Sequence, residues 1–116
     1  MLQYIGVSGN PAVLERIRRW LTDTYGCSVS RCVETLTEVA SLCITNPGVR
    51  AIITDLPPGR LLHKLYDEAA LITKGAKIIV IYPSTSDIFV PSGERNFTVV
   101  PEGRLRWGLD RALHVH

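Results

Sequence analysis

The sequence predicts an α/β fold, a single domain in which five parallel strands alternate with helices. Short apolar runs and helical patterns follow one another along the 116 residues, which is the order of a parallel sheet with crossover helices. The runs 49–54 and 76–82 are apolar without polar alternation, as expected of strands covered on both faces. Helix-start and helix-stop signals separate the runs. We therefore treat residues 1–116 as one domain with a doubly wound sheet.

The first strand and helix have the clearest signals. Residues 2–7 form an apolar run that predicts a buried strand. Asn10 can cap a helix, and Pro11 suits its first turn, where no backbone N–H is needed. Gly26 is predicted to end this helix. The predicted inward face carries apolar residues at helical spacing, Leu14, Ile17 and Leu21, with Val13 and Trp20 beside them.

The next two strand–helix pairs follow the same order. Residues 27–33 alternate and predict a second strand near an edge, and residues 49–54 predict the third strand. Thr35 and Glu38 form a capping-box pattern for the helix between these strands. A third helix is predicted over about 60–74. Its predicted inward residues are Leu61, Leu62, Leu65, Ala69 and Ile72.

The regular pattern fails after the fourth strand. Residues 83–96 are rich in Ser, Pro and Gly and have no helical period. We expect an irregular segment here, with the fourth helix short, degraded or replaced by a loop. Residues 97–100 predict the fifth strand. A last helix is predicted over 104–114, with Leu109 facing inward and Trp107 partly outward.

Composition and charge exclude several functional classes. No apolar run is long enough to span a membrane, and the first residues lack the order of a secretory signal, so we expect a cytoplasmic protein. A net charge of +2 is too small to indicate nucleic-acid binding. Cys27, Cys32 and Cys43 have no metal-ligand spacing and are interpreted as reduced, partly buried thiols. His114 and His116 lack a third ligand. We predict no metal and no cofactor.

Three junctions, in this order, resemble the receiver domain of response regulators in two-component signal transduction. The segment 7–21 is similar to the end of the family's first strand, where two acids and an Asn-Pro or Asp-Pro step precede a helix. The segment 52–59 is similar to the end of the third strand, where an aspartate accepts a phosphoryl group before a Met-Pro-Gly turn. The segment 97–101 is similar to an aromatic-x-x-Lys-Pro step before the last helix. The resemblance implies a flavodoxin-like (βα)5 sheet with strand order 2-1-3-4-5.

The chain departs from the family at the residues that carry its chemistry. Ser8 and Gly9 stand at the positions of the metal-binding acid pair, and Val100 stands at the lysine position. The switch hydroxyl falls on Tyr82, whose ring is too long and rigid to repeat the short movement of a threonine. Asp55, the vestigial phosphoacceptor position, is retained. The resemblance therefore implies a degenerate receiver that is not phosphorylated, because metal and lysine charges stabilise phosphoryl transfer.

Alternative interpretations remain at three places. Counting back from Pro58 places the acceptor at Thr54, whereas a one-residue deletion in the loop places it at Asp55, which can also cap the third helix. Residues 8–10 suit a simple turn and cap, or a phosphate site at a helix N-terminus. The arginines within residues 16–19 suit a solvated helix face or a basic contact face.

The sequence therefore predicts a protein-interaction or dimerisation module in signalling or regulated assembly, not an enzyme. The candidate interface residues are Trp107, Arg104 and Phe97, because the surface around the fifth strand and last helix commonly mediates receiver dimers. The expected partner is a protein, an attached output domain or a second copy that forms a homodimer through this surface. Two alternatives are a working receiver phosphorylated on Asp55 and a flavodoxin-like binder of a small anion or nucleotide.

Overall fold

A five-stranded parallel sheet is the centre of the computed structural model, which describes residues 2–56, 60–73, 76–82 and 97–113. The strand order is β2-β1-β3-β4-β5, so the predicted fold class and topology are confirmed. The strands are β1 Tyr4–Val7, β2 Ser30–Val33, β3 Ala51–Thr54, β4 Lys77–Tyr82 and β5 Phe97–Pro101. The first three strands begin slightly later than their apolar runs predict, because the leading residues of each run form the connection into the strand.

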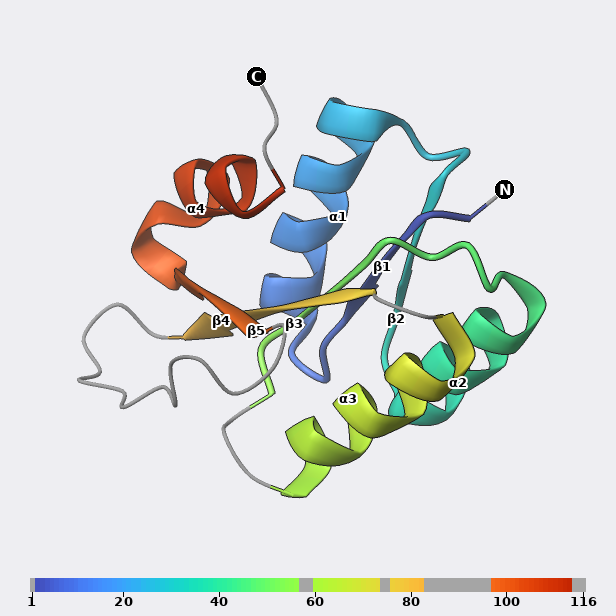
Figure 1. The fold of residues 1–116 in the computed structure, drawn as a ribbon. Helices are drawn as coiled ribbons and strands as arrows, with labels where there is room; N and C mark the ends of the chain where they lie inside the picture. Colours follow the sequence, from blue (N-terminus) through green and yellow to red (C-terminus); the bar gives the residue numbers. More distant parts are fainter. Residues whose placement is uncertain (1, 57–59, 74–75, 83–96, 114–116) are drawn as a thin grey trace.

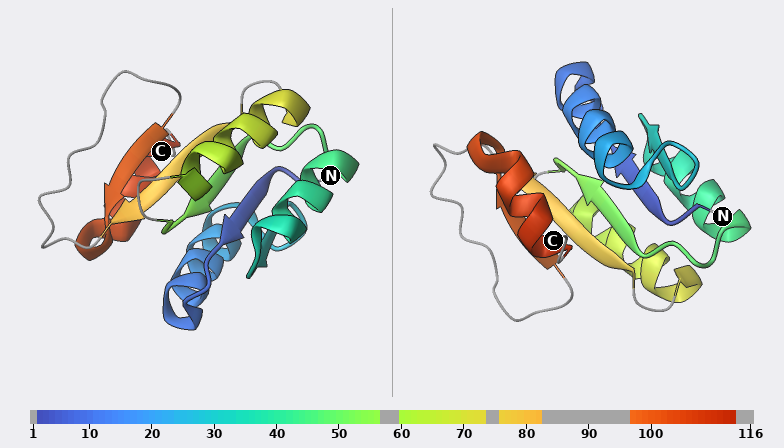
Figure 2. Two further views of the ribbon diagram at one scale, coloured as in Figure 1. Left: turned by 90° about the horizontal axis from the view of Figure 1, so that it is seen from below. Right: turned by 90° about the horizontal axis from the view of Figure 1, so that it is seen from above.

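Within the described residues, two helices cover each face of the sheet (Figure 1). The helices are α1 Pro11–Tyr25, α2 Leu36–Thr45, α3 Arg60–Thr73 and α4 Leu105–Ala112, and a 3-10 turn over Glu102–Arg104 leads into α4. α1 and α4 lie on one face and α2 and α3 on the other, as Figure 2 shows from below and from above. Helices from opposite ends of the chain therefore share one layer.

Local signals start and end the helices as predicted. The Asn10 side chain accepts a hydrogen bond from the Ala12 N–H at 3.0 Å and so caps α1. Gly26 ends α1 with a φ of 94°, a conformation that favours glycine. At α2, the Thr35 hydroxyl accepts the Glu38 N–H at 3.3 Å, and the Glu38 carboxylate accepts the Thr35 N–H at 3.1 Å. These reciprocal bonds form the predicted capping box.

Acid is expected to weaken the cap of α2. Hydrogen bonds from the Thr35 side chain and from the Glu34 and Thr35 backbones lower the pKa of Glu38. The cap therefore contributes stability above the unfolded pKa of about 4.3, and loses it as pH falls through the lower folded pKa. NMR titration of the Thr35 amide should follow this protonation, and Glu38→Gln should abolish the response. An identical titration in both proteins would contradict the assigned bond.

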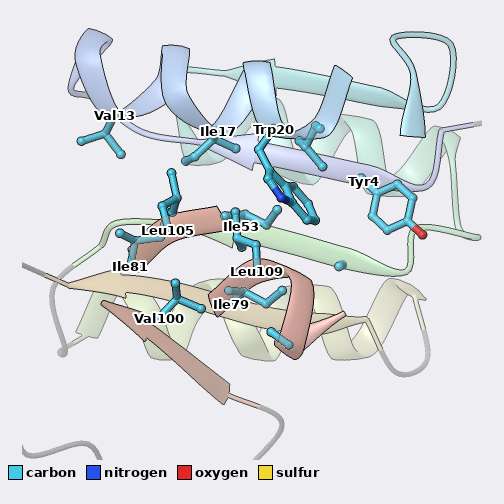
Figure 3. Packing of buried hydrophobic residues seen from close by; sticks show 13 residues of the cluster. Tyr4, Val13, Ile17, Trp20, Ile53, Ile79, Ile81, Val100, Leu105 and Leu109 are labelled. Carbon is cyan, nitrogen blue, oxygen red and sulfur yellow. The ribbon is translucent and has the colours of Figure 1, made fainter. Parts of the chain in front are cut away.

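Alternation along the strands sends side chains into two separate cores. On the α2/α3 face the sheet contributes Ile5, Val7, Ile52, Ile78 and Val80. On the α1/α4 face it contributes Tyr4, Ala51, Ile53, Ile79, Ile81 and Val100. Figure 3 shows Ile17 and Trp20 of α1 and Leu109 of α4 gathered with Ile53 in the second core. The apolar strands are thus covered on both faces, as their sequence predicts.

Leu61 is exposed, contrary to the prediction that it faces inward. Its side chain is 54% exposed, whereas Leu62 and Leu65 are buried against the sheet. Neighbouring helical residues point about 100° apart, so a stripe built on positions 62 and 65 leaves position 61 at its border. There Leu61 lines a shallow groove with Leu36 and Ala40 of α2.

Several predicted features fall outside the described residues. They include the irregular segment expected over 83–96 and the side chains of Tyr82 and Phe97, whose backbones lie in β4 and β5. Among the helices that are described, none combines the length and apolar character needed to cross a membrane.

The three cysteines are free thiols that differ in burial. Cys43 is buried, Cys32 is half-buried and Cys27 is exposed. Burial raises the pKa of both Cys32 and Cys43. These two thiols therefore stay protonated at neutral pH and pack as small apolar groups.

Candidate functional site

The predicted site residues of the first and third strands leave the sheet at the same edge. Val7 ends β1 and pairs with Thr54, which ends β3. Ser8 and Gly9 follow β1, and Asp55 follows β3. Parallel strands bring their carboxyl ends to one edge, where sheets of this kind bind ligands.

The fourth and fifth strands reach the same edge. Tyr82 pairs with Pro101, and Val100 pairs with Ile81 one step earlier. The topology therefore brings the ends of the strands that carry these positions to one edge of the sheet. What these positions can do depends on their side chains.

The hydroxyl of Ser8 is used within the turn that follows β1. Ser8 is 3% exposed, and its Oγ accepts the Asn10 N–H at 2.9 Å and donates to the Asn10 carbonyl at 3.3 Å. The Ser8 N–H donates to the carbonyl of Val33 at 3.3 Å. Gly9 is exposed, with nothing within 4 Å of the place where a Cβ would stand. This geometry matches the simple turn and cap, one of the two interpretations of residues 8–10.

Asp55, directly after β3, is a carboxylate that solvent can reach. Thr54 is fully buried, and its hydroxyl accepts the Leu56 N–H at 3.2 Å, so it is not available to a phosphoryl donor. Asp55 is half-buried and makes no hydrogen bond or ion pair to another described residue. Of the two registers open from the sequence, the geometry favours Asp55. A cap on α3 would involve residues 57–59, which lie outside the description.

Val100 is part of the core and does not line the edge. It is 1% exposed and packs against Gly108 of α4. A Cβ at position 108 would lie 2.4 Å from Val100 Cγ1, so a glycine is needed for this close approach. The lysine of the sheet, Lys77, begins β4 at the opposite edge, where its ammonium donates to the Ala112 carbonyl at 2.7 Å. Among the described residues, no lysine forms an ion pair with Asp55.

The described residues at this edge do not fit the divalent cation of receiver domains. Magnesium requires several oxygen ligands, of which one or two are carboxylates. At the positions of the acid pair the chain has Ser8, whose hydroxyl is used in internal hydrogen bonds, and Gly9, which has no side-chain oxygen. No group of three His, Cys, Asp or Glu residues that could hold a metal occurs in the described part of the chain.

A second feature lies away from this edge, between α1 and α4. A groove of about 650 Å³ separates the two helices, and Trp107 stands at its border with 51% of its surface exposed. The guanidinium carbons of Arg104 and Arg111 lie 5.8 and 5.0 Å from the centre of a Trp107 ring. The outward position predicted for Trp107 is confirmed, and the predicted Arg104 lies beside it.

The residues that α1 contributes to this groove were not predicted as part of a site. Arg16 and Arg19 line it from α1, together with Asp23. The sequence offers two interpretations of these arginines, a solvated helix face and a basic contact face. Their spacing of three residues places them on one side of a helix, but only the packing of α1 beside α4 brings them to Trp107.

Solved structures with this fold include response-regulator receiver domains. A receiver domain protein from Bacillus halodurans aligns with a TM-score of 0.67 and 17% sequence identity, over 96% of each chain. A receiver protein from Sinorhizobium medicae aligns with a TM-score of 0.68 and 14% identity, over 98% of this chain and 95% of that one. The chain therefore has a receiver-like fold.

The same fold also occurs inside a larger protein. A lysine decarboxylase from Francisella novicida aligns with a TM-score of 0.66 and 15% identity over 97% of this chain. The chain spans 16% of the length of that decarboxylase. Neither a protein-family model nor a curated protein matches the sequence. At these identities the likeness establishes the fold, and function must be argued from the residues.

Proposed function

We propose that this receiver-like domain is degenerate and acts, without phosphorylation, as a protein-interaction module in cytoplasmic signalling or regulated assembly. The observation that carries the proposal is the donor set at the strand ends. Ser8 and Gly9 stand at the acid-pair positions, Asp55 forms no ion pair with a described lysine, and the Ser8 hydroxyl is held by Asn10. The role proposed is binding, not catalysis.

Charge explains why such an edge does not transfer phosphoryl groups. The transferred group spreads negative charge over its oxygens, and enzymes stabilise that charge with metal ions and cationic side chains. A metal ion alone contributes several kcal/mol to such a transition state. An aspartate without these groups repels the incoming phosphate. Asp55 is therefore proposed as a remnant of the acceptor position.

Treatment with acetyl phosphate and Mg²⁺ is expected to leave the chain unmodified. Intact-mass spectrometry should show no phosphoryl adduct, and NMR spectra with Mg²⁺ and beryllofluoride should show no shifts clustered at Asp55. The Asp55→Asn variant is the matched control and should behave identically. A receiver domain with an intact acid pair, treated in parallel, should give both signals. A stoichiometric acyl-phosphate that Asp55→Asn abolishes would instead establish the working-receiver alternative.

The small-anion alternative is disfavoured by the hydrogen bonds at the start of α1. The Asn10 N–H donates to Ser8 Oγ, Pro11 has no N–H, and the Ala12 N–H donates to Asn10 Oδ1. An anion at this helix end would have to replace these partners. Thermal-shift measurements with nucleotides and FMN are therefore expected to show no saturable rise in melting temperature, and such a rise would favour the alternative.

The surface proposed for partners is the one centred on α4 and β5. Trp107 is the large exposed apolar residue of this surface, and Arg104 stacks near it. Aromatic and arginine side chains are the types that most often anchor protein interfaces. Phe97 is the first residue of β5, the strand that leads through the 3-10 turn into α4. The partner is a separate protein or an attached output domain, with a homodimer through the same surface as the alternative.

A further inference from the structure

The groove between α1 and α4 combines an apolar anchor with a surplus of positive charge. Arg16 and Arg19 line it from α1, and Arg104 and Arg106 line it from the start of α4. Asp23 is the acidic residue of the lining. Trp20 and Leu105 contribute its apolar floor, and both are buried.

Two arginines of the groove form exposed ion pairs, and carboxylates of a partner protein can replace the present acidic residues in these pairs. A guanidinium nitrogen of Arg106 lies 3.4 Å from a carboxylate oxygen of Asp23, and the two side chains are 70% and 64% exposed. Arg16 lies 3.2 Å from Glu102 and also donates to the Glu102 carbonyl at 2.9 Å. Solvent-exposed pairs contribute at most about 1 kcal/mol, so carboxylates from another protein can compete for these arginines.

Two further arginines pair with no carboxylate in the described part of the chain. Arg104 and Arg111 instead stand over the ring of Trp107, at 5.8 and 5.0 Å. Cation–π contacts of this kind hold a guanidinium in place while its N–H groups stay free to donate. The Trp107 surroundings therefore offer oriented donors beside an exposed ring.

We propose that this groove binds an acidic segment of a partner protein that carries an apolar side chain, with Trp107 as its anchor. This inference rests on the proposed interaction function and identifies the chemistry of the partner. Carboxylates of the segment would pair with the groove arginines, and its apolar side chain would cover Trp107.

Charge argues against the other occupants. In a two-fold contact between copies the same residues meet across the axis, so a contact centred on Trp107 would oppose arginines to arginines. The carboxylates of Asp23, Glu15 and Glu102 lie among the arginines and would repel the phosphates of a nucleic acid. The chain as a whole carries a net charge of only +2. A protein segment with separated carboxylates matches this mixed pattern better than a continuous row of phosphates.

The test uses a fluorescein-labelled helical peptide built of glutamate and leucine, with a glutamine-and-leucine peptide as its control. Fluorescence anisotropy should show saturable binding of the acidic peptide only, weakened as salt rises to about 1 M, where charges are screened within ~3 Å. NMR shifts should cluster at the groove and at the Trp107 indole N–H. Trp107→Ala and Arg106→Glu should each weaken binding about tenfold or more.

Matched variants distinguish binding in the groove from a general attraction between the acidic peptide and a positively charged protein. Arg31→Glu makes the same charge change at an exposed position on β2, and it should leave the affinity within about twofold. Arg104→Lys keeps the charge and should retain more affinity than Arg104→Glu. Size-exclusion chromatography with light scattering should show a monomer at the concentrations used.

Any one of the following results would overturn the proposal: no saturable binding of the acidic peptide, equal loss of affinity with Arg31→Glu and Arg106→Glu, or tighter binding of a single-stranded oligonucleotide. Self-association that Trp107→Ala abolishes would replace the acidic segment with a second copy. Each of these results leaves the phosphorylation experiment unaffected, so failure of the groove and failure of the proposed function are distinguishable.

Discussion

Trp20→Ala is expected to lower the free energy of unfolding by about 4 kcal/mol, whereas Trp107→Ala should lower it by less than about 1 kcal/mol. The two tryptophans differ in burial: Trp20 is 3% exposed and Trp107 is 51% exposed. Trp20 also donates from Nε1 to Asp110 Oδ1 at 3.1 Å and so joins α1 to α4. Removing Trp20 leaves a cavity in the core and an unpaired carboxylate at its border. Urea unfolding followed by far-UV circular dichroism measures both changes.

Trp20→Phe separates packing from hydrogen bonding at this position. The phenyl ring keeps much of the apolar contact but cannot donate to Asp110, so we expect a loss of about 1–1.5 kcal/mol from the missing bond. The Trp107→Ala protein retains only the buried indole, and its fluorescence should shift to shorter wavelength than that of Trp20→Ala. Equal destabilisation by Trp20→Ala and Trp107→Ala would contradict this arrangement of α1 and α4. If Trp107→Ala leaves the free energy of unfolding nearly unchanged, a loss of peptide binding by that variant cannot be attributed to unfolding.

Gly108→Ala is expected to destabilise the protein by about 2 kcal/mol although alanine is the better helix former. A methyl group at position 108 would lie 2.4 Å from Val100 Cγ1 and 3.2 Å from Val100 Cβ and Cγ2. Carbon atoms in contact prefer about 3.5–4.0 Å, so α4 would have to move away from β5. Gly9→Ala is the matched control, because open space surrounds position 9. It should be neutral or stabilise by up to about 1 kcal/mol.

A double-mutant cycle assigns the effect to this contact. Val100→Ala removes both Cγ atoms and should cost about 1–2 kcal/mol alone, yet combined with Gly108→Ala the total loss should be smaller than the sum by about 1 kcal/mol. Thermal and urea unfolding of the four proteins provide the measurement. Strict additivity would show that Val100 does not face Gly108, and would reopen the possibility that Val100 borders the strand ends.

The start of each of the first two helices could be predicted because the signals are local. Asn10 bonds to a backbone group two residues away, and the Thr35–Glu38 box spans three residues. The sheet order also followed from the sequence, because three junctions in a fixed order resemble one family. The face of Leu61 could not be predicted, since two adjacent leucines suit two overlapping helical stripes and only packing selects one.

The candidate site was predicted in part. The sequence indicated which positions meet at the strand ends, and it indicated that Trp107 points outward. It left open whether Thr54 or Asp55 occupies the acceptor position, because a loop deletion cannot be located without the register of β3. Burial of Thr54 and the bond from Leu56 favour Asp55. The internal use of the Ser8 hydroxyl likewise needs three-dimensional coordinates.

Strands, caps and the missing charges of a receiver could be recognised from residue types alone, because each depends on neighbours a few positions apart. The burial of Trp20 against α4 and the arginine groove depend on α1 lying beside α4, and the contact of Val100 with Gly108 depends on α4 packing on β5. Trp20 and Asp110, which join these helices, are separated by 90 positions in the chain. Contacts at that distance arise when the whole sheet folds, and no local pattern encodes them.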